Sequence, residues 1–172
     1  FMVIMISVLW LVVRAVVWSK QKRIEWKREL QLLLVYICII VVVRFTFCPF
    51  GKVDGKIQPL VFYKDNWFPF RINLLPFVYL FDYPTLKEAL LNLIGNTTMF
   101  IPVGIIWPMV FKKLDTPAKV IAAGVGFSFC IEILQLPFYD RVSDVDDLIL
   151  NSLGYTIGYG IYAGVKCMKQ KN

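Results

Sequence analysis

The sequence predicts an all-α fold: a polytopic transmembrane helix bundle of about five spans with an aromatic interfacial segment. Hydrophobic residues make up 58% of the 172-residue chain, and its mean hydropathy is +0.64, whereas soluble domains contain roughly 45–50% apolar residues. The apolar residues are concentrated in long runs, and about 20 such residues in a helix cross a hydrocarbon core about 30 Å thick. We therefore expect a single membrane domain over residues 1–172.

The first part of the chain, residues 1–70, is predicted to hold two spans and an outer loop. The spans are the apolar runs at 1–18 and 30–47, and a strongly basic segment separates them. Arg14 lies one turn from the end of the first run, so its long side chain is expected to reach the nearer interface. Residues 59–84 are rich in aromatic rings and in prolines, which disfavour a continuous helix. Aromatic residues are enriched at membrane interfaces, so this segment should lie in or dip into one.

The remaining spans form a core over residues 71–168. The third predicted span is 85–111, and Thr85 followed by Glu88 has the pattern of a capping box. The fourth is 118–138. An acidic turn then leads to the last span.

The fifth predicted span is 145–168, and we expect Ser143 or Asp144 to cap its start. Small residues four positions apart in this span allow another helix to approach closely. The motifs are Gly154-x-x-x-Gly158 and Gly160-x-x-x-Gly164.

The distribution of basic residues predicts the orientation. Five spans place the two ends of the chain on opposite sides of the membrane. Cytoplasmic loops are enriched in Lys and Arg, and an amino end outside puts eleven of these residues in the inner segments and five in the outer ones. We therefore expect a multi-pass cell-membrane protein with its amino end outside and its carboxyl end cytoplasmic. The inner residues are Lys20, Lys22, Arg23, Lys27, Arg28, Lys112, Lys113, Lys119, Lys166, Lys169 and Lys171, and the outer ones are Lys52, Lys56, Lys64, Arg71 and Arg141.

Composition also excludes several classes of function. The net charge of +7 follows from this asymmetry, so it does not indicate a nucleic-acid partner. The four cysteines show neither the spacing of a zinc site nor that of a secreted disulfide framework. Histidine is absent, which removes the commonest metal ligand and general base. We expect no cofactor and no metal site, and membrane lipid as the general partner.

Polar side chains of the last three spans are predicted to form one layer near the outer surface. The helical rise places most of them about 5 to 13 Å below the outer ends of their helices. Asn92 and Asn96 share a helix face, as do Asp147 and Asn151. Ionisable groups at membrane depth are costly unless paired or hydrated, and so are candidates for a functional site. The layer consists of Asn92, Asn96, Glu132, Gln135, Asp147 and Asn151.

A second interpretation treats these groups only as contacts between helices, since such hydrogen bonds contribute about 0.6–2 kcal/mol each. It suits the asparagines better than Glu132, because a buried carboxylate needs a partner or a proton. Arg44, Arg71 and Arg141 are candidate partners on the outer half. For the acids of the turn, solvation and helix capping are equally good explanations.

Several ordered motifs extend from residue 71 to residue 162. They are Arg71-x-Asn73-Leu74-Leu75-Pro76-Phe77, Asn92-x-x-Gly95-Asn96, Phe100-x-Pro102-x-Gly104, Glu132-x-x-Gln135, Arg141-x-x-Asp144-x-Asp146-Asp147, and Asn151-x-x-Gly154 with Gly158. Together they are similar to the VanZ-like family of bacterial integral membrane proteins, whose core would be residues 71–168. Where many members have glycine before the arginine of the acidic turn, this chain has Asp140.

The resemblance implies a cell-envelope protein of a Gram-positive bacterium, associated with teicoplanin-type antibiotic resistance, and it supplies no reaction. Our first hypothesis is an outer-leaflet polar site that binds an amphiphile, either a lipoglycopeptide antibiotic or a cell-wall lipid precursor. The alternative is a membrane enzyme acting on a lipid head group through carboxylates or a divalent cation; a structural partner of the cell-wall machinery is a third class. The candidate ligand-binding residues are Arg71, Asn73, Asn92, Asn96, Glu132, Gln135, Arg141, Asp144, Asp147 and Asn151.

Overall fold

The computed structural model describes residues 2–21, 23–47, 52–53, 56–57, 71–78, 85–138 and 142–171. Within them the chain forms five helices and four two-residue strands, which confirms the all-α class. The helices are α1 (Met2–Lys20), α2 (Trp26–Phe47), α3 (Leu86–Val110), α4 (Pro117–Gln135) and α5 (Val145–Lys171). The strands are β1 (Lys52–Val53), β2 (Lys56–Ile57), β3 (Ile72–Asn73) and β4 (Ser143–Asp144).

Each helix begins and ends within about one turn of its predicted bounds. Of the helices described, α1 to α4 are long and apolar enough to cross a membrane, so the chain is a multi-pass membrane protein. The 27-residue α5 is long enough but is not among them, because acidic, amide and tyrosine side chains dilute its apolar residues. It packs against α3 and α4, so these polar side chains can face protein. That α5 crosses the membrane stays a prediction.

Most of the aromatic segment at 59–84 lies outside the described residues, and its interfacial position is therefore a prediction. The same holds for Asp140 and Arg141 of the acidic turn.

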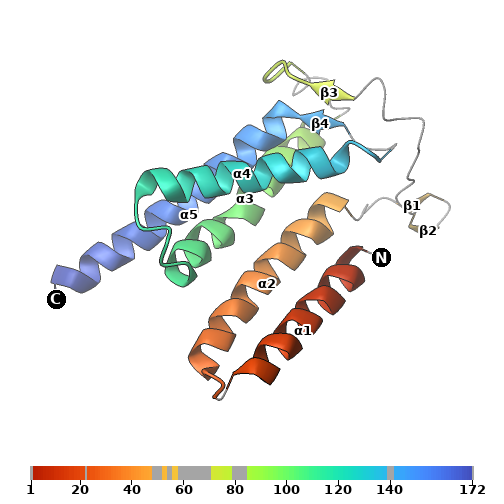
Figure 1. Cartoon of the computed structure of the whole chain (residues 1–172). Coiled ribbons are helices and arrows are strands. Elements are labelled where there is room, and N and C mark those ends of the chain that lie inside the picture. The colour runs from red at the N-terminus through yellow and green to blue at the C-terminus, as the bar shows by residue number, and fades with distance from the viewer. Residues whose placement is uncertain are drawn as a thin grey trace.

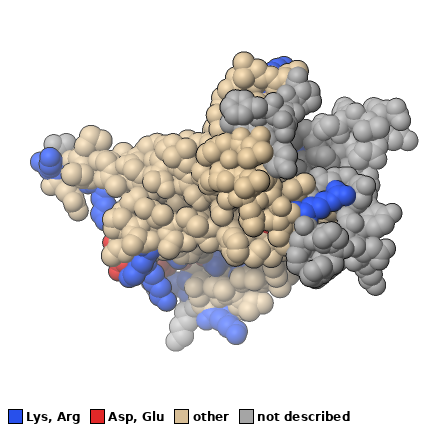
Figure 2. Space-filling model, turned by 90° about the horizontal axis from the view of Figure 1, so that it is seen from above, with Lys and Arg blue, Asp and Glu red and all other residues tan. Residues whose placement is uncertain are grey.

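Figure 1 shows α1 and α2 as a hairpin beside a bundle of α3, α4 and α5. α1 packs on α2, and α2 packs on α3. Consecutive helices alternate in direction, so one end of the bundle gathers the start of α3, the end of α4 and the start of α5, beside β3 and β4. We call this the polar end. The opposite end, where α2 begins, α3 ends and α5 carries its terminal lysines, is called the basic end. In Figure 2 the visible surface is mostly uncharged, and Lys and Arg atoms are concentrated toward the basic end.

Side-chain caps fix the starts of the three core helices. The Glu88 N–H donates to the Thr85 hydroxyl (3.2 Å), and Thr116 caps α4 in the same way by accepting from the Lys119 N–H (3.4 Å). At α5 the Asp146 N–H donates to Asp144 Oδ1 (2.9 Å). A cap of this kind satisfies an N–H that the helix itself leaves without an acceptor. The predicted caps Thr85 and Asp144 are confirmed.

Glycines set the contact between α3 and α5. A Cβ added at Gly154 would collide with the carbonyl of Thr97, and one at Gly158 with the carbonyl of Ile101. Because both sequence numbers rise together along the contact, α3 and α5 run parallel at backbone distance. In the second motif, an added Cβ at Gly160 or Gly164 meets no atom of the described residues within 4 Å, so its predicted role as a close contact is wrong among the described helices.

The core lies where α5 meets α3 and α4. Tyr155 is fully buried; its ring lies over Gly124, where no side chain could fit, and meets the ring of Trp107 edge-on at 6.1 Å. Phe100 and Val103 of α3 are buried in the same cluster. The polar side chains of the last three helices are held above this apolar layer.

The Arg14 side chain does not extend into solvent as expected. It is buried and forms a two-pronged ion pair with Glu29 of α2, in which Nε donates to Oε2 at 2.9 Å and Nη2 donates to Oε1. The two residues lie in different helices separated by a turn. Pairing is preferred because it satisfies both charges inside the bundle.

Candidate functional site

The centre of the candidate site is Asp144, at the junction of β4 and α5. Its backbone N–H donates to Glu132 Oε2 (3.0 Å), and its Oδ1 accepts from the side-chain amide of Asn73 (3.0 Å). Glu132 is 4% exposed and Asn73 is 9% exposed. One residue thus connects the end of α4, the start of α5 and the loop before α3.

A short parallel strand pair reinforces this connection. Ile72 lies opposite Ser143 and Asn73 opposite Asp144, and the Ser143 N–H donates to the carbonyl of Arg71 (3.0 Å). The Arg71 side chain is exposed. A two-residue pairing between segments about 70 positions apart leaves no periodic signal, and the sequence did not predict it.

The loop beyond β3 is held in an unusual backbone conformation. Phe77 has φ of 61°, a region that an aromatic residue rarely adopts and that costs about 1–3 kcal/mol. Its N–H donates to Asp146 Oδ1 (2.8 Å), and the Leu75 N–H donates to Asn73 Oδ1 (3.1 Å). These bonds hold the loop against the start of α5. Asp146 therefore serves the site, although the sequence suggested for it only capping or solvation.

A second polar contact joins α3 to α5. The Asn96 side-chain amide donates to Asp147 Oδ1 and lies 3.5 Å from Asn92 Oδ1. All three side chains lie at the polar end and belong to the predicted layer. They are half-buried, so an approaching molecule can reach them.

Asn151 lies deeper and pairs with α4. Its amide donates to the Ser128 hydroxyl (3.0 Å), and the two residues are 2% and 0% exposed. Asn151 Oδ1 and Gln135 Oε1 are buried with no hydrogen-bond partner among the described residues. Ser128 was not among the predicted residues, although it precedes Glu132 by one helical turn and so shares its face of α4.

The predicted convergence of three helices is therefore present in the structure. Of the ten candidate residues, nine are described and lie at the polar end; Arg141 lies outside the described residues. They divide into an Asp144 network, an Asn96–Asp147 contact and a deeper Asn151–Ser128 pair. No described His, Cys, Asp or Glu side chains form a group of three or more that could hold a metal ion.

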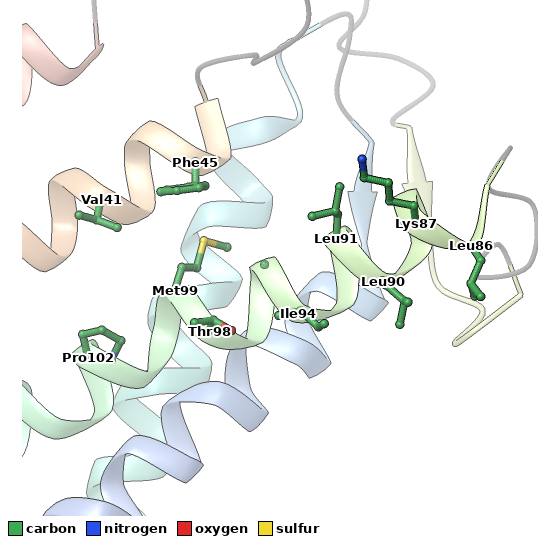
Figure 3. Close-up of a pocket in the computed structure, with 11 residues that line it drawn as sticks. Val41, Phe45, Leu86, Lys87, Leu90, Leu91, Ile94, Thr98, Met99 and Pro102 are labelled. Atoms are coloured by element: carbon green, nitrogen blue, oxygen red, sulfur yellow. The ribbon is translucent and has the colours of Figure 1, made fainter.

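Beside this network an apolar groove of about 780 Å³ lies between α2 and α3. Figure 3 shows Val41 and Phe45 of α2 on one side, facing Met99 and Pro102 of α3, with Lys87 at the end where α3 begins. Most of the lining is aliphatic or aromatic. The groove was not predicted, because its two walls come from helices that are distant in sequence.

The α3 wall of the groove adjoins the polar layer. Leu91, Ile94 and Gly95 line the groove, and Asn92 and Asn96 follow Leu91 and Gly95 directly, about 100° around the helix. One end of this arrangement is therefore polar and carries a cation, and the other is apolar.

Comparison with known proteins agrees with this architecture. The chain is 28% identical over 87 residues to the uncharacterized membrane protein YwnJ of Bacillus subtilis (strain 168), which covers 51% of this chain and 59% of that protein, less than two thirds of its length. It is 29% identical over 117 residues to protein VanZ of Enterococcus faecium, which covers 67% of this chain and 68% of that protein. No solved structure matches.

The family model described as VanZ/LLP1 matches residues 33–166. This range begins inside α2 and ends near the end of α5, so it contains the groove, the polar network and the contact between α3 and α5. Because the match extends over more than half of the sequence, the chain belongs to the VanZ/LLP1 family.

Proposed function

We propose that this chain is a cell-envelope protein whose polar end faces outward and binds an outer-leaflet amphiphile. The observation that carries the proposal is the groove of about 780 Å³, which is apolar along α2 and α3 and has Lys87 in its lining at the end where α3 begins. An amphiphile needs such a combination. Its acyl chain would lie along Ile94 and Met99, and its polar head beside Lys87 and Asn92.

The position of an exposed cation supports placing the polar head at the end of the groove where α3 begins. Lys87 is exposed and makes no ion pair with a described residue, so its ammonium group is available to a phosphate or carboxylate. The half-buried Asn92 and Asn96 add amide donors and acceptors about one and a half and two and a half turns further along α3. Asp147 holds Asn96 and so keeps this polar surface in place.

The amphiphile is either a lipoglycopeptide antibiotic or a cell-wall lipid precursor. Similarity to protein VanZ of Enterococcus faecium favours a role in resistance of the teicoplanin type. The lipoglycopeptide and the lipid precursor each join an acyl chain to a large polar head. In a Gram-positive host, a protein that holds either one at the outer surface would change the encounter between drug and target.

A variant that fills the groove tests this function. Gly95 lines the groove, and a Cβ added there has no atom of a described residue within 4 Å, so Gly95→Trp should occupy the groove without disturbing the fold. Gly126 of α4 also has open space at its Cβ but does not line the groove, so Gly126→Trp is the matched control. Each variant would be expressed in a teicoplanin-susceptible Gram-positive host, with membrane levels compared by immunoblot.

We expect the parent chain and Gly126→Trp to lower susceptibility to teicoplanin, and Gly95→Trp to return it to that of the empty vector. Protection should be weaker against a glycopeptide that lacks an acyl chain, because that molecule cannot use the groove. Equal protection by Gly95→Trp and Gly126→Trp would refute binding in the groove.

A further inference from the structure

A second cavity lies at the basic end, which is the opposite end of the bundle from the candidate site. It has a volume of about 670 Å³ and is formed by the start of α2 and the turn after α3. Its polar lining consists of Glu25, Lys27, Arg28, Gln31, Lys112 and Lys113. Four cations therefore face one acid.

Two described acids at this end already pair with a cation, and the one acid in the cavity lining is outnumbered by cations. Glu29, next to the cavity in sequence, is occupied by Arg14. Asp115 accepts a hydrogen bond from Lys119 (2.8 Å), which holds the pKa of Asp115 below its usual range. Only Glu25 remains among the lining residues, and it forms no ion pair with a described cation.

Arg28 helps to fix the shape of the cavity. Its Nη1 donates to the carbonyl of Val110 (2.8 Å), which joins the first turn of α2 to the last turn of α3. Arg28 is half-buried, whereas Lys27, Lys112 and Lys113 are exposed and pair with no described carboxylate. The cations thus surround a cavity whose two walls are joined by a hydrogen bond, and they are not spread over a flat surface.

Helix stability does not explain all of these charges. Lys112 and Lys113 follow the end of α3, where the helix dipole favours a cation. Lys27 and Arg28 occupy the first turn of α2, where the dipole favours an anion instead. An anion bound in the cavity would face the positive end of the α2 dipole and four cationic side chains, two of which offset the negative end of the α3 dipole.

We propose that this cavity binds the phosphate of an anionic phospholipid in the membrane leaflet at the basic end. A lipid is the source because the cavity lies at the ends of apolar spans, with Met109 and Phe111 in its lining. Basic pockets between transmembrane helices are suited to such head groups. This inference does not rest on the function proposed for the polar end, since the two sites share no residue.

The test compares two ways of removing the same charge. Lys112→Gln/Lys113→Gln removes two cations from the cavity, and Lys169→Gln/Lys171→Gln removes two exposed cations from the end of α5, outside it. All four lysines are exposed, so both variants should fold, which circular dichroism checks. Binding of phosphatidylglycerol and phosphatidylcholine to the purified full chain would be titrated by native mass spectrometry.

We expect the parent chain to prefer phosphatidylglycerol. The cavity variant should bind it about 30-fold more weakly, from roughly a fivefold factor for each lysine near an anionic surface, and the α5 variant should bind it as the parent does. An equal loss in both variants would show that the charges act only through the overall field. Equal binding of the two lipids by the parent, or displacement of phosphatidylglycerol by an equal concentration of inorganic phosphate, would also overturn the proposal.

Discussion

The substitution Gly158→Ala tests the backbone contact between α3 and α5. The new Cβ would lie far closer than 3.0 Å to the carbonyl of Ile101, and about 3 Å from two further backbone atoms of α3. Backbone cannot rotate away as a side chain can, so α3 and α5 must separate. Added volume in a packed interior costs about 1–3 kcal/mol.

Gly160→Ala is the matched control, because the Cβ added at Gly160 meets no described residue within 4 Å. Alanine is a better helix former than glycine by about 1 kcal/mol, and this gain is common to both variants. The difference between them therefore isolates the packing cost. For a chain of this size it corresponds to a melting temperature roughly 2–12 °C lower for Gly158→Ala than for Gly160→Ala.

The assay is thermal unfolding in a mild detergent, followed by circular dichroism. Separation of the helices should also weaken the hydrogen bond from Asn96 to Asp147, so Gly158→Ala should lose protection against teicoplanin while Gly160→Ala keeps it. If the two variants melt at the same temperature, the backbone contact between α3 and α5 is not present in the folded protein and the reasoning fails.

Two further outcomes follow from the structure. Replacing Arg14 with Met should destabilise the chain by about 3–5 kcal/mol because it leaves Glu29 buried and unpaired. The double variant Arg14→Met/Glu29→Met should recover most of that loss in the same melting assay. An equal or larger loss in the double variant would contradict the pairing. In a variant whose sole cysteine is the exposed Cys167 of α5, a membrane-impermeant maleimide should label cells only after permeabilisation, and labelling of intact cells would reverse the predicted orientation.

Local pattern was sufficient for the helices, since α1 to α4 each correspond to an apolar run long enough to be read without its neighbours and α5 begins at a recognisable cap. The caps at Thr85 and Asp144 were also predictable, because a cap bonds to N–H groups two or three residues away. The motif at Gly154 and Gly158 was read correctly for the same reason. The identical spacing at Gly160 and Gly164 was not, because nothing in the spacing says which face of α5 meets α3.

Partners of polar residues required the fold. Arg14 was expected at the interface and was found paired with Glu29, and Asn151 was placed in the layer without its partner Ser128. The position of Phe77 against Asp146 depends on a loop that packs across the start of α5. In each case the two residues are separated by at least one turn or helix, so the distance between them is a tertiary property.

The sequence by itself determined the class of protein, the approximate bounds of the helices and the side of the bundle on which amides and acids gather, because hydropathy, length and charge act along the chain. Only the tertiary structure decided which of these groups meet, and that an apolar groove adjoins them at one end while a basic cavity lies at the other. Both hollows are formed by helices that are distant in sequence, and packing of the side chains between those helices sets their size.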